Sequence, residues 1–85
     1  MEKPKTTIGF YEQKKAMCQK IEATIKEVTA QGKAAILQKL SDVVTAESGM
    51  SALTKKHVEL LIRQNKVKKT FNEEGLEIVE WIGKE

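Results

Sequence analysis

The chain has 85 residues and a formal net charge of +3 at pH 7, a length that suits one small domain. Its one cysteine, Cys18, rules out an internal disulfide, which excludes the disulfide-rich secreted class and predicts a reducing, cytoplasmic location. The sequence contains no apolar run near the ~20 residues that cross a bilayer. The charged residues 1–5 are not followed by the apolar core of a signal peptide.

The charges are unevenly distributed along the chain. Residues 1–69 carry 14 Lys or Arg and 7 Asp or Glu, whereas residues 70–85 carry one lysine and five glutamates. This segregation is typical of a basic surface that faces a polyanion, with the acidic end of the chain turned elsewhere. Plain solubility explains the charge equally well.

The first predicted element is a long amphipathic helix over residues 10–30, after a flexible leader at residues 1–9. Gly32 supplies a left-handed residue to end this helix. Steps of about 100° per residue place one strip of apolar side chains toward the core and a second strip beside it. The core strip comprises Phe10, Met17, Ile21 and Val28, and the second strip comprises Tyr11, Cys18 and Ile25.

Two shorter helices are predicted next, over residues 34–45 and 52–64. Residues 33–35 are expected to form a brief extended segment before the first of them, and residues 46–49 to form a turn after it. Asn65 follows the second, where asparagine substitutes for glycine in a left-handed cap.

Beyond Asn65 the hydrophobic period changes from helical spacing to alternation. Residues 67–71 and 76–82 are rich in β-branched and aromatic side chains, and the turn sequence Asn-Glu-Glu-Gly at residues 72–75 separates them. The sequence therefore predicts an antiparallel hairpin. The expected order is helix, short strand, helix, turn, helix and hairpin.

This order and several local sequences resemble the winged helix-turn-helix family. The stretch 58–69 resembles the passage from recognition helix into wing, with Leu61, Asn65 and Val67 at the places of the helix leucine, the turn residue and the first wing residue. Residues 36–40 resemble the support helix, and residues 49–51 the turn between the helices. The chain departs from the family in having Asn65 where glycine is commoner and an acidic wing tip.

The resemblance implies an α+β winged helix over residues 10–83 that binds double-stranded DNA without catalysis, as a small transcriptional regulator. The exposed face of the third helix is expected to enter the major groove. Lys55, Lys56 and Arg63 are assigned to the groove, and Ser51 and Thr54 to phosphate or to capping of the helix. Glu59 either accepts a hydrogen bond from cytosine or pairs with a neighbouring cation. Electrostatic attraction is assigned to Lys66, Lys68 and Lys69.

Other residues carry weaker signals. Many small winged helices dimerise through a long first helix, which suggests a homodimer with Tyr11, Cys18 and Ile25 at the interface. His57 falls within the apolar arc of the third helix and is expected to be partly buried. One histidine and one cysteine give no zinc ligand set. No catalytic motif, cofactor motif or set of pocket residues stands out, so the sequence predicts neither an enzyme nor a small-molecule ligand.

A second function of a different class fits the same fold. Glu73 and Glu74 at the predicted wing tip repel phosphate, so the wing is not expected to clamp DNA. The alternative is a winged-helix protein-interaction module within a larger assembly, which would use the acidic wing and the first helix as contact surfaces.

Overall fold

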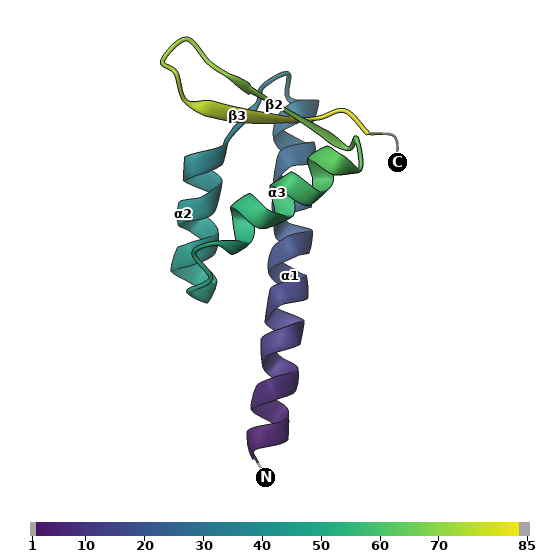
Figure 1. Cartoon of the computed structure of the whole chain (residues 1–85), viewed down its shortest axis with the longest axis vertical. Coiled ribbons are helices and arrows are strands. Elements are labelled where there is room, and N and C mark those ends of the chain that lie inside the picture. Colours follow the sequence, from purple (N-terminus) through teal and green to yellow (C-terminus); the bar gives the residue numbers. More distant parts are fainter. Residues whose placement is uncertain (1, 84–85) are drawn as a thin grey trace.

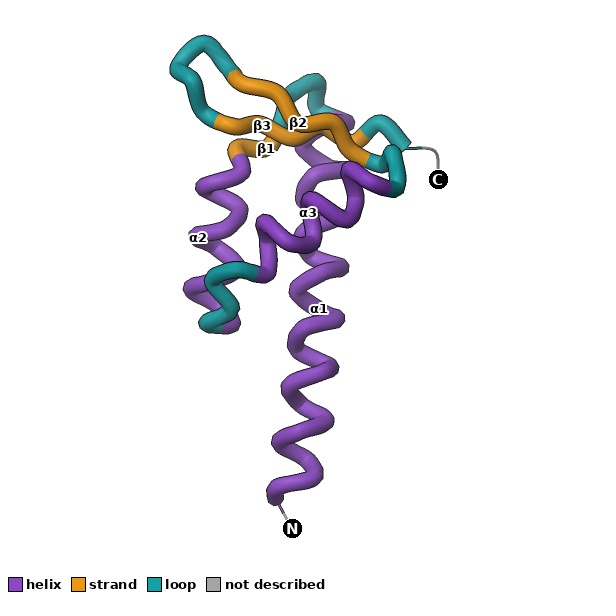
Figure 2. Tube along the Cα trace, in the orientation of Figure 1, coloured by secondary structure: helices purple, strands orange, loops and turns teal. Residues whose placement is uncertain are grey.

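The computed structural model describes the backbone of residues 2–83 and the side chains of residues 11–83. Its elements are α1 (Glu2–Ala30), β1 (Ala35–Ile36), α2 (Leu37–Ser48), α3 (Leu53–Arg63), β2 (Val67–Phe71) and β3 (Glu77–Trp81). Within this range the three helices lie below one antiparallel sheet with strand order β1-β3-β2, as Figures 1 and 2 show. The predicted α+β class and the predicted order of elements are confirmed.

Three boundaries differ from the prediction by three residues or more. Helix α1 starts at Glu2 and so includes the segment expected as a leader, whose side chains lie outside the described residues. Helix α2 begins at Leu37, because Ala35 and Ile36 pair with β3. It continues to Ser48, because Gly49 adopts φ 74° and its N–H donates to the Thr45 carbonyl at 2.7 Å.

The end of α3 follows the predicted cap. Asn65 has φ 61°, and its N–H donates to the Ile62 carbonyl at 3.0 Å. The Lys66 N–H donates to the Leu61 carbonyl at 2.9 Å, so these two bonds satisfy carbonyls at the helix end. The chain then turns directly into β2 at Val67.

Alternation along the hairpin decides which side chains meet the helices. Val67 and Val79 are buried on the inner face of the sheet, and Lys69, opposite Val79, belongs to the same face. Lys68 and Glu80 pair on the outer face. The inner face thus closes the core while the outer face turns away from the three helices.

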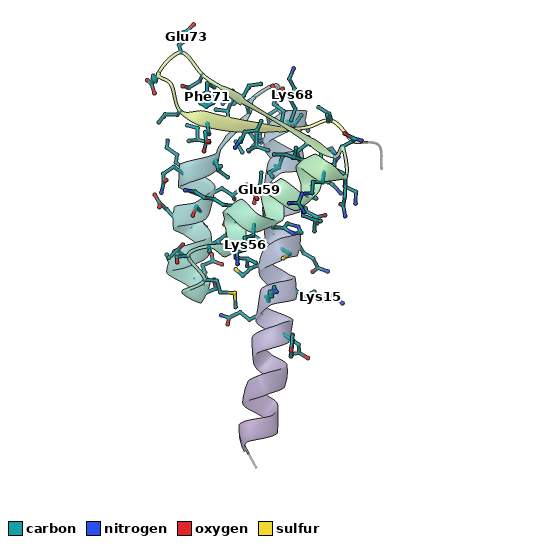
Figure 3. All side chains as sticks on the ribbon, viewed as in Figure 1. Lys15, Lys56, Glu59, Lys68, Phe71 and Glu73 are labelled. Atoms are coloured by element: carbon teal, nitrogen blue, oxygen red, sulfur yellow. The ribbon has the colours of Figure 1, made fainter. Side chains whose placement is uncertain are left out.

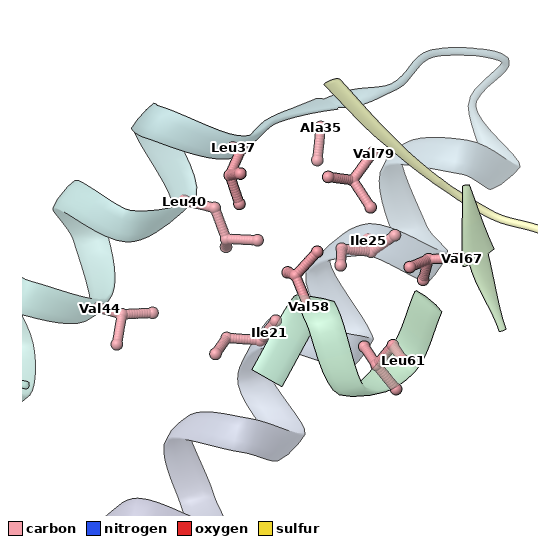
Figure 4. Packing of buried hydrophobic residues seen from close by; sticks show 10 residues of the cluster. All are labelled: Ile21, Ile25, Ala35, Leu37, Leu40, Val44, Val58, Leu61, Val67 and Val79. Carbon is pink, nitrogen blue, oxygen red and sulfur yellow. The ribbon is translucent and has the colours of Figure 1, made fainter. Parts of the chain in front are cut away.

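The core draws on every element of the described chain (Figure 4). Ile21 and Ile25 of α1 have no exposed surface, and they pack with Val44 of α2, Val58 of α3 and Val79 of β3. The assignment of Ile25 to an exposed dimer edge is therefore wrong. The helices and the sheet cover α1 over a wider arc than the predicted strip, so Ile21 and Ile25, one turn apart, are both enclosed.

Polar contacts fix the same arrangement. The backbone N–H of Trp81 in β3 donates to Thr29 Oγ1 of α1 at 2.9 Å. The Lys26 ammonium lies 4.7 Å from the centroid of the Trp81 ring. Lys20 of α1 forms an ion pair with Glu47 of α2. These contacts all involve the C-terminal half of α1.

The N-terminal half of α1 extends away from the rest of the domain (Figures 1 and 2). The helix has 29 residues and is therefore about 43 Å long. All side chains from Tyr11 to Ala16 are exposed, and Met17 is the first side chain described as packing against the core. About 15 residues of helix thus lie outside the packed body.

Adjacent leucines on α3 give a matched test of this packing. Leu61 is 1% exposed and Leu60 is 43% exposed. Leu61→Ala is expected to lower the free energy of unfolding by about 2–4 kcal/mol, because it leaves a cavity among Ile25, Val58 and Val67. Leu60→Ala, the control, is expected to change it by less than about 0.5 kcal/mol. Urea unfolding followed by circular dichroism measures both, and equal losses would contradict the assigned orientation of α3.

Candidate nucleic-acid interface

The outward face of α3 carries the charged residues that the sequence assigned to DNA. Lys55, Lys56, Glu59 and Arg63 are all exposed, while Val58 of the opposite face is buried. Figure 3 labels Lys56 and Glu59 along α3. The structure therefore brings these four predicted site residues together on one helix face. Among the described residues, no ion pair joins Glu59 to Lys55 or Arg63.

The inner face of the hairpin contributes one more lysine to this surface. Lys69 and Glu77 form an ion pair at 3.4 Å, and both border a hollow of about 160 Å³ between α3 and the hairpin. Lys55 and Glu59 line the same hollow from the side of α3. Two lysines and two carboxylates therefore meet there, and the carboxylates reduce the attraction that Lys69 can offer a phosphate.

The other two hairpin lysines lie elsewhere. Lys68 is on the outer face of the sheet opposite Glu80, and Figure 3 shows its side chain on the side away from α3. Lys66 is exposed at the junction between α3 and β2, where its carbonyl accepts hydrogen bonds from the N–H groups of Ile82 and Gly83 at 2.8 and 2.9 Å. The sequence assigned Lys66, Lys68 and Lys69 together to electrostatic attraction, but side chains alternate along β2, so Lys68 and Lys69 lie on opposite faces of the sheet.

Of the two hydroxyls assigned to phosphate, only one is accessible. Thr54 is 0% exposed and its Oγ1 has no hydrogen-bond partner among the described residues, so it neither reaches a phosphate nor caps the helix. Thr54, Val58 and Leu61 are spaced at i, i+4 and i+7, as residues on one buried helix face are. This spacing could have predicted that Thr54 is buried. Ser51 is exposed just before α3. The N-cap residue is Ala52, which has no capping side chain.

The turn of the hairpin is acidic and well ordered by its own hydrogen bonds. Asn72 Oδ1 accepts the N–H groups of Glu74 and Leu76, each at 2.9 Å, and Gly75 has φ 84°. Glu73 and Glu74 are exposed, and Figure 3 shows Glu73 at the outer end of the hairpin. Beside them Phe71 is 61% exposed. The turn therefore presents carboxylates and apolar surface together.

A larger depression, which the sequence analysis did not predict, lies between α1 and the N-terminal half of α3. This groove, which we call the α1–α3 groove, has a volume of about 520 Å³. Its apolar lining includes Cys18, Met50, Leu53 and Leu60, and Lys14 and Lys56 also line it. These residues come from two segments that are far apart in the chain, 14–18 and 50–60, so no local pattern could have grouped them.

One wall of this groove is held by a contact between the two helices. His57 Nε2 of α3 donates to Glu22 Oε2 of α1 at 2.8 Å, with side-chain exposures of 12% and 31%. The prediction of a partly buried His57 is confirmed. The contact fixes the separation of α1 and α3 next to the groove.

Burial raises the pKa of the Cys18 thiol above its ordinary value; nearby Lys14 opposes this rise and Glu22 adds to it. The thiol is therefore protonated at neutral pH and a weak nucleophile. Folding favours the protonated form, so its contribution to stability is present below the ordinary thiol pKa and is lost as the pH rises through the raised value.

Comparisons with protein-family models, curated proteins and solved structures found no match to this chain. Within the described residues, no group of three or more His, Cys, Asp or Glu side chains is placed to hold a metal ion. No described helix is long and apolar enough to cross a membrane.

The raised pKa of Cys18 predicts slow modification of this thiol. At pH 7.5 its reaction with a disulfide reagent is expected to be slower in the folded protein than in the urea-unfolded chain, because less thiolate is present. The difference in rate should narrow as the pH is raised and more of the folded thiol ionises. Stopped-flow absorbance measures the rates; a folded thiol that reacts as fast as the unfolded one at pH 7.5 would contradict the assigned environment.

Proposed function

We propose that this protein is a winged-helix domain that binds double-stranded DNA with α3 in the major groove and acts as a transcriptional regulator. The proposal is supported by the arrangement of elements: α2 and α3 are joined by a short turn, and α3 leads directly into a hairpin whose sheet also includes β1. The observation that carries it is the joint exposure of Lys55, Lys56 and Arg63 on one face of α3.

The chemistry of that face suits duplex DNA. The major groove is about 12 Å wide and admits one helix, and lysine or arginine donates there to guanine O6 and N7. Lys55 and Lys56 lie in the first turn of α3, the end of a recognition helix that meets base edges. Glu59, which has no ion pair with its neighbours on α3, suits the amino group of cytosine. Because Thr54 is buried, Ser51 is the residue whose hydroxyl would contact a phosphate.

The hairpin has a small part in this proposal. Glu73 and Glu74 repel phosphate, Lys69 is paired with Glu77, and Lys68 lies on the opposite face of the sheet. Binding therefore depends on α3 and on Lys66 beside its C-terminal end. A protein with so few phosphate contacts is expected to bind nonspecific DNA weakly and to lose affinity as salt increases.

The double variant Lys55→Glu/Lys56→Glu tests the proposed interface. Its affinity for random duplex DNA is expected to fall at least tenfold, roughly the loss of two phosphate or base contacts, and the slope of log affinity against log salt to flatten by about 2. Fluorescence anisotropy with labelled duplex at several salt concentrations measures both quantities.

The matched control is Lys33→Glu/Lys39→Glu, which makes the same change in net charge at two exposed positions away from α3. It is expected to lower affinity far less, because only long-range attraction is lost. If both variants lose affinity equally, binding reflects net charge and α3 is not the interface. If neither variant changes the affinity, α3 has no part in binding.

One observation favours the protein-interaction module as a second candidate. Phe71 and Leu76 are 61% and 40% exposed on either side of the acidic turn, and Asn72 holds that turn in one conformation. Exposed apolar side chains ringed by charge are typical of a contact with another protein. Retention of function in cells by Lys55→Glu/Lys56→Glu, together with its loss in Phe71→Ser, would favour this candidate over DNA binding.

Dimerisation is a further part of the proposal. Isolated helices shorter than ~12–15 residues are marginal in water, and the projecting half of α1 is about that long. With Ile25 in the core and Cys18 on the wall of the α1–α3 groove, Tyr11 remains at the predicted interface, and it is 67% exposed. A homodimer would set two α3 helices about 34–36 Å apart for one turn of DNA.

We expect light scattering to give the mass of a dimer at tens of micromolar protein, and Tyr11→Glu to shift the equilibrium toward monomer, because it places a charge in the apolar contact. Gln13→Glu adds the same charge on the other side of α1 and is expected to leave the dimer intact. A wild-type protein that remains monomeric under these conditions would exclude the dimer.

A further inference from the structure

The α1–α3 groove has the dimensions and lining of a small-molecule site. Its volume of about 520 Å³ lies within the range of about 300–1,000 Å³ that is usual for ligand pockets. Cys18 and the side chains of Met50, Leu53 and Leu60 give it a mainly apolar surface. Leu60 is 43% exposed although it is a large aliphatic residue on a packed domain. An apolar ligand would remove this surface from water.

The charges of the groove have one sign. Lys14 of α1 and Lys56 of α3 both line it, and none of the described residues that line it carries a carboxylate. The carboxylate of Glu22 accepts a hydrogen bond from His57 at the contact between α1 and α3. The groove thus combines an apolar surface with two ammonium groups supplied by separate helices.

We propose that this groove binds an amphipathic organic anion: a compact aromatic or aliphatic body with one carboxylate or sulfonate group. The body packs against Leu53, Leu60 and Met50, and the acidic group is bound by the ammonium groups of Lys14 and Lys56. Charge complementarity selects this class, because a neutral apolar molecule leaves both ammonium groups without a counter-charge and a cation is repelled by them.

A second copy of the chain fits the groove less well. The segment that would reach it is the projecting half of α1, and residues 1–16 carry four lysines and two glutamates. Placing that positive segment beside Lys14 and Lys56 brings like charges together. The dimer contact proposed at Tyr11 lies about one helical turn nearer the N-terminus than Lys14.

The position of Lys56 links this site to the DNA-binding face. Lys56 is part of the exposed face of α3 and also lines the groove. An anion held there neutralises a charge that the proposed interface uses, so the ligand and DNA are expected to weaken each other's binding. This consequence rests on the proposed function, whereas the site itself does not.

Two probes of similar shape test the site. Anilinonaphthalene sulfonate has an aromatic body and a sulfonate, and phenylnaphthylamine has a similar body without the charge. Fluorescence titration of the full chain is expected to show one sulfonate probe bound per chain, with an affinity at least tenfold above that of the neutral probe. Similar affinities for the two probes, or binding of several sulfonate molecules per chain, would overturn the proposal.

Three variants at exposed positions locate the binding. Lys56→Met is expected to weaken the sulfonate probe about threefold to tenfold, the loss of one charge-assisted contact, and to leave the neutral probe unchanged. Leu60→Gln is expected to weaken both probes, because it removes apolar surface from the groove. Lys55→Met removes the same charge from the neighbouring position outside the groove and is expected to change neither. Circular dichroism confirms that each variant is folded.

The same variants separate this inference from the proposed function. Lys55→Met is expected to weaken DNA binding and to leave sulfonate binding intact. If the protein binds no DNA but Lys56→Met still weakens the sulfonate probe selectively, the ligand site stands and the proposed function fails. If Lys55→Met and Lys56→Met weaken the probe equally, the probe follows net charge and the groove is not its site. A second copy of the chain that covers the groove would also overturn the proposal. In that case the wild-type protein is a dimer that binds no probe, and Leu60→Gln dissociates it.

Discussion

Burial of Ile21 and Ile25 is the interaction on which the rest of the structure depends. Both side chains are fully enclosed, and they join α1 to α2, α3 and the sheet in one core. With α1 fixed there, α3 is oriented by Val58 and Leu61, which are buried in the same core. A helix that buries one face presents the other to solvent. The exposure of Lys55 and Lys56 therefore follows from the packing of the opposite face of α3.

The periodicity of the sequence predicted what depends on local order. The three helices, the hairpin, the short extended segment and the left-handed cap at Asn65 are each specified by neighbouring residues, and all are present. Ile25 and Thr54 were misplaced for a different reason. A helical projection gives the angle of each side chain, but the width of the buried arc depends on how many elements surround the helix. The α1–α3 groove was invisible for the same reason, since its walls are distant in the sequence.

The acidic residues near the C-terminal end of the chain have an electrostatic effect on the candidate site. Glu77 pairs with Lys69 at 3.4 Å, and the carboxylates of Glu73 and Glu74 are exposed at the turn. A duplex that approached the hairpin would meet negative charge, whereas one that approached α3 would meet Lys55, Lys56 and Arg63. Both candidate functions are compatible with this division, because the hairpin stays available to a protein while α3 is occupied.

Lys56 is the point where this division becomes consequential. A lysine at an exposed helix position contributes little to the stability of the fold. Its charge therefore matters mainly for the binding of other molecules. Its neighbour Lys55 borders the hollow beside Glu59 and Glu77, whereas Lys56 borders the apolar groove, whose described lining residues include no Asp or Glu. The two adjacent lysines therefore differ in the charged side chains around them, although their sequence context is nearly the same. An anion that binds near α3 is drawn toward Lys56, and any ligand held there changes the charge of the same helix face that a nucleic acid would contact.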